Sequence, residues 1–383
     1  MTGGTTKQNL TPNTQVQTAY LLTDDGKIYS GRAFGYVPDS EQSTTAGEMV
    51  FTTSMIGYLG TLCDPGYFGQ IVIQAFPLIG NYGVVSADFE SETPAVSAYI
   101  VRDYCQAPSN FRSEGTLDIF LSKHKIPGIY GIDTRALIRR VRDKGRMNGL
   151  ITYTLPTIEE YADILSNFTI KDAVKSVTAS AEARTYVPEN AAKCKIGLWN
   201  LGAKRNIIPN LLSRDCEVTE ILPFTSAEEI LKCGFDGIVL SNGPGDPADN
   251  SGIAEQIKKV MASGIPMFGI SLGHQLVSIA AGARTARLDS GHRGSNQPVK
   301  RMSDGEVFIT SQNHGYTVDA NSLPANAETT FANLNDNTCE GIEYKDMPVI
   351  TVQFVPEECP GARDTMYLYD KFISMIEKCK GER

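Results

Sequence analysis

The feature that most constrains the fold is the regular alternation of short apolar segments with amphipathic ones in the second half of the chain. The apolar segments are too short for buried helices and are typical of strands covered on both faces. The expected strands lie at 196–199, 216–222, 237–240 and 266–270, and the expected helices lie at 203–213, 253–261 and 272–281, with a further short helix opened by the capping box at 226–229. This alternation predicts a parallel sheet with helices on both faces.

The length of 383 residues favours two domains rather than one. The first, expected at 18–178, opens with a hairpin whose strands at 19–23 and 28–31 flank an Asp-Asp-Gly turn. A helix is expected at 134–143, so we interpret this block as a mixed α/β domain. A polar stretch at 179–192 is the expected linker, and 193–383 is expected to form an α/β domain with a central, mostly parallel sheet.

The rest of the composition limits the partners. Residues 1–17 are rich in Thr, Gln and Asn without an apolar core, so we expect a disordered tail and no secretory signal. A formal net charge of -9 argues against binding to nucleic acid, and no apolar run approaches the roughly 18 residues that span a membrane. The eight cysteines include no Cys-x-x-Cys pair, so we expect reduced thiols in the cytoplasm, and no metal or organic cofactor site is evident.

The segment Phe-Gly-Ile-Ser-Leu-Gly-His-Gln at 268–275 is the strongest indication of chemistry. A buried strand is expected to end at Ile270 and a helix to begin at Leu272, which places Ser271 on the tight turn called a nucleophile elbow. Glycines at 269 and 273 permit the sharp turn and close packing of the helix. The turn lifts the side chain of residue 271 out of the sheet and aims the Leu272 N–H at a developing oxyanion.

A second loop, Ser-Asn-Gly-Pro-Gly-Asp-Pro at 241–247, follows the preceding strand. Two glycines around a proline give a stiff loop with exposed backbone amides, and ligands bind at the carboxyl ends of parallel strands. By itself, the loop is equally typical of a plain turn.

These two segments resemble the class I glutamine amidotransferases when they are taken with Gln-Asn-His-Gly-Tyr at 312–316 and Gln-Phe-Val-Pro-Glu at 353–357. Four further segments are similar to the small subunit of carbamoyl phosphate synthetase: Phe-Thr-Thr-Ser-Met at 51–55, Asp-Pro-Gly-Tyr at 64–67, Ile-Asp-Thr-Arg at 132–135 and Gly-Ala-Lys-Arg-Asn-Ile at 202–207. The resemblance covers nearly everything after the N-terminal tail. It implies a small-subunit domain followed by a class I glutamine amidotransferase domain.

In that family the small subunit hydrolyses glutamine, and the ammonia reaches a large subunit that makes carbamoyl phosphate from bicarbonate and ATP. The resemblance therefore implies a large-subunit partner, L-glutamine as a ligand, and Mg-ATP on the large subunit rather than on this chain. It also implies a role in arginine and pyrimidine biosynthesis. The family's catalytic groups are a cysteine at the elbow, a histidine near the C-terminus, and a glutamate two residues later that orients the histidine.

The chain departs from this pattern at both reacting positions. The nucleophile position is Ser271 and the base position is Val355, so only Glu357 of the family's triad remains. The serine that helps to hold the glutamine backbone in the family is Gly66 here, which costs about 1 kcal/mol of binding. Three departures in one pocket favour natural divergence over a single engineered change from cysteine to serine.

The chemical consequence follows from acidity. A serine hydroxyl is far less acidic than a thiol and needs a positioned general base before it attacks an amide. Valine accepts no proton, and Glu357 would lie beyond the missing imidazole. His274 lies one helical turn past Ser271, where we expect packing or hydrogen bonding, and His314 is expected to shape the binding loop. We therefore predict that glutamine hydrolysis is lost or very weak.

The pocket is still expected to bind glutamine weakly, because the other positions of the family's pattern are kept. The backbone amides of Gly243 and Leu272 would form the oxyanion hole. The remaining expected glutamine contacts are Gly245, Gln275, Asn313, Gly315 and Tyr316.

Two other interpretations remain open at this point. A regulatory, glutamine-sensing paralogue would bind glutamine or another small amide without cleaving it. A serine hydrolase would need a strand-end acid and a later histidine, and neither is convincing after Ser271. Cys359, beside two glutamates, is interpreted as structural, and the Lys204-Arg205 pair fits either a solvated helix face or a subunit contact.

Overall fold

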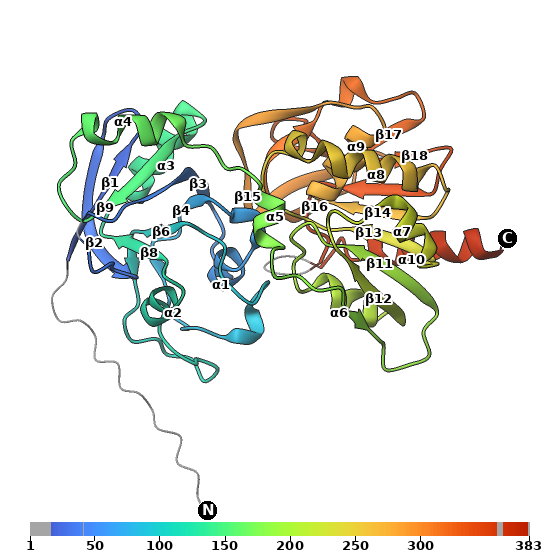
Figure 1. Cartoon of the computed structure of the whole chain (residues 1–383), viewed down its shortest axis with the longest axis horizontal. Helices are drawn as coiled ribbons and strands as arrows, with labels where there is room; N and C mark the ends of the chain where they lie inside the picture. Colours follow the sequence, from blue (N-terminus) through green and yellow to red (C-terminus); the bar gives the residue numbers. More distant parts are fainter. Residues whose placement is uncertain (1–16, 41, 358–362, 382–383) are drawn as a thin grey trace, which may run out of the picture.

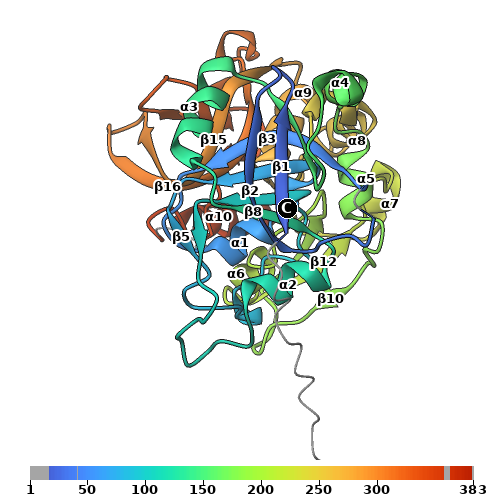
Figure 2. The same cartoon turned by 90° about the vertical axis from the view of Figure 1, so that its left-hand side faces the viewer.

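The computed structural model describes residues 17–40, 42–357 and 363–381, and in it the chain forms two domains that lie side by side (Figure 1). The short helix α5 (Ala173–Val177) lies between them, and a view turned by 90° places the strands of the first domain in front of the second (Figure 2). Apart from its last residue, the expected N-terminal tail falls outside the described residues, as does Cys359.

The first domain is a closed β-barrel, which is a more regular structure than the mixed α/β block expected from its sequence. Around the wall the order is β1 (Thr18–Thr23), β2 (Ile28–Gly35), β8 (Pro127–Tyr130), β6 (Ala98–Val101), β4 (Gln70–Gln74), β3 (Thr45–Thr52) and β9 (Asn148–Thr152). Parallel pairs join β3 to β4, β4 to β6 and β6 to β8. The expected hairpin is confirmed, because Leu22 pairs with Ile28 across the turn.

Strands β4 and β6 are buried at every position, so both of their faces are covered, which explains their apolar sequences, whereas β2 alternates between exposed and half-buried positions. The helices are α1 (Tyr58–Leu62), α2 (Leu117–Lys123), α3 (Thr134–Lys144) and α4 (Ile158–Asn167), and the short strands β5 (Leu78–Ile79) and β7 (Asp103–Tyr104) form a separate pair. Ile71 and Ile73 pack in one cluster with α3, whereas Val72 packs in another with α1 and α2. Helix α3 confirms the helix expected at 134–143, and the Asp133 side chain caps its N-terminus.

The second domain contains a ten-stranded sheet whose central five strands are parallel, as the alternating segments predicted. Its order is β10 (Thr185–Tyr186), β12 (Cys216–Ile221), β11 (Cys194–Trp199), β13 (Gly237–Leu240), β14 (Met267–Ile270), β19 (Val349–Val352), β18 (Cys339–Tyr344), β16 (Val307–Val318), β15 (Thr285–Arg301) and β17 (Ala327–Asn333). The strands from β18 to β17 are an antiparallel extension beyond the predicted parallel part.

Helices cover both faces of the parallel strands. They are α6 (Ile207–Leu212), α7 (Ala227–Lys232), α8 (Ser251–Met261), α9 (Leu272–Ala280) and α10 (Tyr367–Gly381). Leu240 and Met267 pack with α7, α8 and α9, whereas their neighbours Val239 and Phe268 pack with α6 and α10. This alternation follows from the two-residue period of a strand, which sends successive side chains to opposite faces.

Local sequence features explain where several elements begin. Both hydrogen bonds of the capping box between Ser226 and Glu229 are present at the start of α7. Helix α6 begins later than expected, and Pro209 lies within its first turn, where the missing N–H is tolerated. Part of the predicted linker joins the sheet, because β10 pairs with β12.

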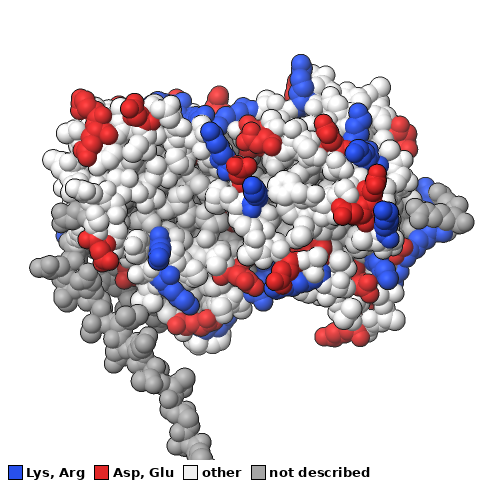
Figure 3. All heavy atoms as spheres, viewed as in Figure 1, with Lys and Arg blue, Asp and Glu red and all other residues white. Residues whose placement is uncertain are grey.

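None of the helices in the described ranges is long and apolar enough to cross a membrane. Acidic and basic side chains are interspersed on the face shown in Figure 3. Many charged side chains of the described residues form surface ion pairs, such as Lys371 with Glu343 at 2.7 Å. Exposed pairs of this kind contribute about 0–1 kcal/mol each, so the buried cores rather than surface charge stabilise the two domains.

The contact between α9 and β13 gives a first test. A Cβ at Gly273 would lie 2.5 Å from the Leu240 carbonyl oxygen, so Gly273→Ala forces the helix away from the strand. We expect the free energy of unfolding to fall by about 1–3 kcal/mol, measured by urea denaturation. Gly252, at the matching second position of α8, has open space at its Cβ, so Gly252→Ala should stabilise by about 0.5–1 kcal/mol. Equal effects of the two substitutions would contradict the close contact.

Candidate functional site

Ser271 occupies a strained turn between β14 and α9, which is the elbow geometry expected from the sequence. Its φ of 54° and ψ of -106° lie in a region that residues other than glycine seldom occupy. The Ser271 N–H donates to the Val352 carbonyl at 2.8 Å, and the Ser271 carbonyl accepts from the Gln275 N–H at 3.1 Å. A Cβ at Gly269 would lie 3.0 Å from the Gly273 carbonyl group, so both glycines are required for the strand and helix to meet so closely.

Gly243 and Leu272, whose N–H groups are expected to form an oxyanion hole, are packed closely together. A Cβ at Gly243 would lie 2.7 Å from the Leu272 side chain and 2.3 Å from the Leu201 carbonyl oxygen. Within the described residues, neither the Gly243 nor the Leu272 N–H donates to an acceptor. Leu272 also begins α9, where the helix dipole favours negative charge. N–H groups without an acceptor near the start of a helix are what the expected oxyanion hole requires.

The base position offers no proton acceptor. Val355 is buried, and its N–H donates to the Ser311 carbonyl at 2.9 Å. Its side chain lines a small cavity together with Asp64, Lys204 and Asn313. Because the side chain is a hydrocarbon, it cannot take the hydroxyl proton of the elbow serine.

His274 does not replace the missing base. Its Nδ1 lies 2.8 Å from the Thr351 hydroxyl, which donates in turn to the Ile342 carbonyl at 3.3 Å. Burial lowers the pKa of His274 to about 3, so the imidazole is neutral. Its Nε2 is buried without a hydrogen-bond partner among the described residues. The side chain therefore has the packing and hydrogen-bonding role expected of it.

Glu357 is fully buried and has only one of its two carboxylate oxygens satisfied. Oε2 accepts from the Tyr369 hydroxyl at 2.8 Å, whereas Oε1 has no hydrogen-bond partner in the described part of the chain. Burial raises the pKa of Glu357 to about 7, against the opposing effect of the Lys204 charge. The carboxyl therefore holds its proton more firmly in the folded protein than in the unfolded chain.

A buried ion pair joins the two domains at the site. Asp64 of the first domain lies 3.4 Å from the Lys204 ammonium of the second, and each side chain is 5% exposed. Asp64 Oδ2 also accepts from Asn313 Nδ2 at 3.1 Å. Removing one partner of such a pair typically costs 3–5 kcal/mol, because the other charge is left buried. These contacts fix the relative position of the domains at the pocket.

A larger cavity of about 340 Å³ lies between the domains. Its lining includes Gly66, Gly245, Gly315 and Tyr316, together with the charged residues Glu48, Asp246, Asp249, Arg146, Lys171, Arg287 and Arg293. Groups of both signs suit an amino acid that carries an ammonium and a carboxylate. Gln275 lies behind this cavity rather than in its wall, because its Nε2 donates to the Tyr316 carbonyl at 2.8 Å.

The absence of a side chain at Gly66 leaves room for the side-chain amide of Asn313. A Cβ at Gly66 would lie 2.7 Å from Asn313 Nδ2 and 3.0 Å from Asp64 Oδ1. A serine there would therefore displace the Asn313 amide from its contact with Asp64. The Gly66 N–H also donates to Asp64 Oδ1 at 2.8 Å.

Sequence reasoning missed several residues of the site. Lys204 is buried, which excludes for this residue one of the two alternatives left open, a solvated helix face, whereas Arg205 is exposed. Lys204 and Asp64 both lie within segments that carry the family resemblance, and this resemblance was the one indication that they belong to the site. Arg287 pairs with Glu48 at 2.9 Å, and no sequence pattern indicates this contact.

Comparison with known proteins agrees with this architecture. Residues 21–151 match the family model of the carbamoyl-phosphate synthase small chain, CPSase domain, and residues 199–375 match that of class-I glutamine amidotransferases. The carbamoyl phosphate synthase small chain of Fusobacterium nucleatum is 45% identical over 359 residues, which cover 93% of this chain and 98% of that protein. The corresponding protein of Clostridium perfringens is 43% identical over 356 residues, with the same two coverages.

A third relative, the carbamoyl phosphate synthase pyrimidine-specific small chain of Bacillus subtilis, is 42% identical over 362 residues, 94% of this chain and 97% of that protein. The chain belongs to the carbamoyl phosphate synthase small-chain family. The family and the fold expected from the motifs are thus confirmed. The small-chain match covers most of the barrel domain, and the amidotransferase match runs from the end of β11 into α10.

The buried carboxyl of Glu357 should make stability depend on pH. Its pKa is raised from 4.5 to about 7, so between these values the folded state keeps a proton that the unfolded state loses. The contribution of this proton to the free energy of unfolding is fully present below pH 4.5 and is lost as the pH rises through 7. Glu357→Gln removes this titration, so the variant should gain up to about 3 kcal/mol relative to the parent protein between those pH values.

Urea unfolding of both proteins at pH 5 and pH 8 measures this difference. Glu328→Gln, which removes an exposed partner of Lys345, is the matched control and should show no such trend. A difference between Glu357→Gln and the parent that stays constant over this range would contradict the raised pKa.

Proposed function

We propose that this chain is the small subunit of a carbamoyl phosphate synthase and completes the complex with a large subunit while hydrolysing little or no glutamine itself. The large subunit would take nitrogen from free ammonia and would bind Mg-ATP. The carbamoyl phosphate would serve arginine or pyrimidine biosynthesis, and the name of the Bacillus subtilis relative supports the second.

The observation that carries this proposal is the valine at position 355 beside an unsatisfied glutamate. Val355 offers no proton acceptor, and the orphan Oε1 of Glu357 is an oxygen that an imidazole N–H at position 355 could satisfy. The strained turn at Ser271 and the buried Glu357 support this proposal, in which the specific defect is the missing imidazole at position 355.

The size of the defect follows from the chemistry of serine. A positioned general base typically contributes 10²–10⁴-fold to a rate, and a serine hydroxyl has no thiolate-like state near neutral pH that would reduce this need. In serine hydrolases, loss of the histidine alone removes about 10⁶-fold of turnover. Residual acceleration from an oxyanion hole is not enough for an amidotransferase.

A glutamine-sensing regulatory protein is a second candidate. The observation that favours it is the cavity of about 340 Å³ at the domain junction, which keeps charged groups of both signs although the reacting groups are gone. Binding of glutamine without turnover, by a chain that does not associate with a large subunit, would support this candidate over the first.

The direct test is carbamoyl phosphate synthesis by this chain with a large subunit from the same genome. We expect activity with ammonium chloride and none above background with glutamine, because the ammonia-producing step is missing. Efficient synthesis from glutamine would refute the proposed loss, and failure to bind the large subunit would favour the sensing role.

Restoring the missing groups should restore glutamine hydrolysis only in combination. We expect Ser271→Cys and Val355→His each to leave the rate near background, since one lacks a base and the other lacks a good nucleophile. The double variant should exceed either single variant by at least about 10²-fold in glutamate release. Full activity in Ser271→Cys alone would show that another group already acts as the base.

A further inference from the structure

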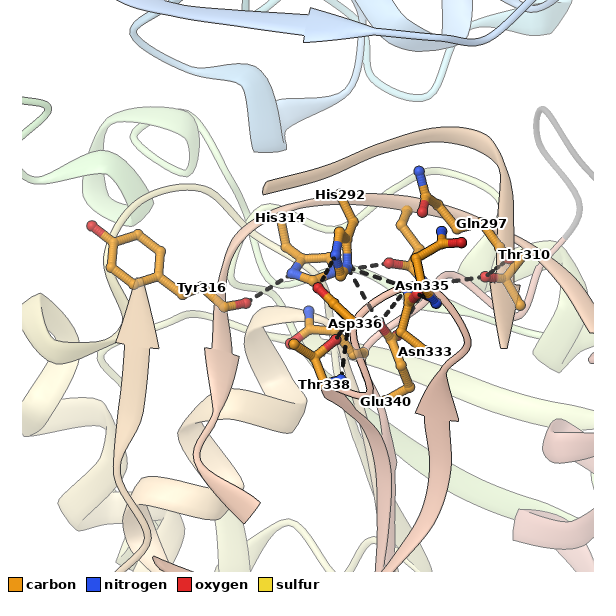
Figure 4. Close-up of polar contacts among 12 residues, drawn as sticks. His292, Gln297, Thr310, His314, Tyr316, Asn333, Asn335, Asp336, Thr338 and Glu340 are labelled. Atoms are coloured by element: carbon orange, nitrogen blue, oxygen red, sulfur yellow. Dashed lines mark hydrogen bonds and ion pairs between the residues drawn. The ribbon is translucent and has the colours of Figure 1, made fainter. Parts of the chain in front are cut away.

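A cluster apart from the elbow joins three antiparallel strands of the second domain. His292 on β15 and His314 on β16 are cross-strand partners, and their rings meet edge to face with centroids 4.9 Å apart. Glu340 on β18 is completely buried beside them. One ligand atom from each of the three residues lies within 4.8 Å of the others, and Figure 4 shows the side chains converging.

Each imidazole is oriented by an acceptor on its far side. His292 Nε2 lies 2.9 Å from Asp336 Oδ2, and the other oxygen of Asp336 accepts from the Thr338 hydroxyl at 2.7 Å. His314 Nδ1 lies 2.8 Å from the Tyr316 carbonyl oxygen. These acceptors take the N–H of each ring, so His292 Nδ1 and His314 Nε2 present lone pairs to the cluster. Histidines that bind metals in proteins have this arrangement.

Each of these lone pairs faces an acceptor oxygen. His314 Nε2 lies 2.8 Å from Gln312 Oε1, and His292 Nδ1 lies 3.4 Å from Glu340 Oε1. Asn333 Nδ2 makes a long contact of 3.4 Å with His292 Nδ1 and also donates to Glu340 Oε1 at 3.3 Å. Two buried acceptors as close as those of His314 and Gln312 are stabilised only by a proton or a cation between them.

Reversing the Gln312 amide does not remove the conflict. In the present orientation, Gln312 Nε2 donates to Glu340 Oε2 at 3.0 Å and to the Thr310 hydroxyl at 3.1 Å. The reversed amide would place an oxygen against the Glu340 carboxylate instead. The surplus of acceptors therefore belongs to the cluster as a whole and not to one side-chain orientation.

We propose that this cluster binds a divalent first-row transition-metal ion, zinc or one of similar preference, through His292 Nδ1, His314 Nε2 and the Glu340 carboxylate. Gln312 Oε1 is the neighbouring oxygen that could complete the set. Two imidazoles and a carboxylate suit such ions better than calcium or magnesium. Ligands about 2.1 Å from a tetrahedral ion lie roughly 3.4 Å apart, so binding would draw ligand atoms that now lie within 4.8 Å of one another inward by at most about 1.4 Å.

The proposed ion would have a structural role. This proposal is therefore independent of whether the chain hydrolyses glutamine. His314 lies between Asn313 and Gly315, two expected glutamine contacts. The residue after His292 is Arg293, whose carbonyl accepts from the Thr53 N–H of the first domain at 3.4 Å. A cation here therefore ties the β15–β16 hairpin, which contacts both the pocket and the other domain, to β18. Because its ligands come from three strands, the sequence showed no metal-binding pattern.

The test uses the full chain without an affinity tag, expressed with zinc in the medium and analysed for metals by mass spectrometry. We expect about one ion per chain, and we expect the metal-free protein to bind added zinc or cobalt with a rise in melting temperature. His292→Asn and Glu340→Gln should abolish this binding. His124→Asn, a histidine of the barrel domain, is the matched control and should retain it.

Asp336→Asn guards against variants that fail to fold, because this side chain is 39% exposed and contacts His292 from outside the proposed ligand set. We expect metal affinity to fall about 10–100-fold in this variant while the metal-free protein keeps its melting temperature. A parent protein that carries no ion, and binds zinc no more tightly than His292→Asn does, would overturn the proposal. In that case a proton, and not a metal ion, would lie between His314 Nε2 and Gln312 Oε1.

Discussion

The strained turn at Ser271 is the constraint on which the rest of the site depends. A positive φ at a residue other than glycine costs about 1–3 kcal/mol, and here the packing of α9 on β13 and β14 holds the backbone in that conformation. The same close contact that aims residue 271 also builds the core of the second domain, through Gly269 and Gly273. The chain can therefore lose the reactive side chain without losing the turn, because the turn is required for folding.

The departures from the family pattern are changes of side chain. Ser271 lies on the elbow before α9, Val355 lines the small cavity beside Lys204, and Gly66 lines the larger cavity between the domains. The buried pair of Lys204 with Asp64 holds the barrel against the sheet, and both residues line the small cavity that also contains Val355.

The sequence predicted the parallel strands and the elbow well, because both depend on local patterns. Apolar runs such as β13 and β14 are buried on both faces, and the Gly-x-Ser-x-Gly spacing fixes the turn between strand and helix. The barrel was not predicted, since its closure rests on pairings between distant segments, such as β1 with β9. The burial of Lys204 and the His292–His314–Glu340 cluster were missed for the same reason, because their partners lie on other strands or in the other domain.

The central claim is that an intact elbow without a base does not hydrolyse glutamine. Release of ¹⁵N-ammonia from glutamine labelled at the side-chain amide, by the complex with a large subunit, tests it most directly when the parent protein is compared with Ser271→Ala. The account predicts the same background rate for both, since Ser271 has no group to take its proton. A parent rate well above that of Ser271→Ala would contradict it and would show that the serine reacts with help from a residue other than the valine at position 355.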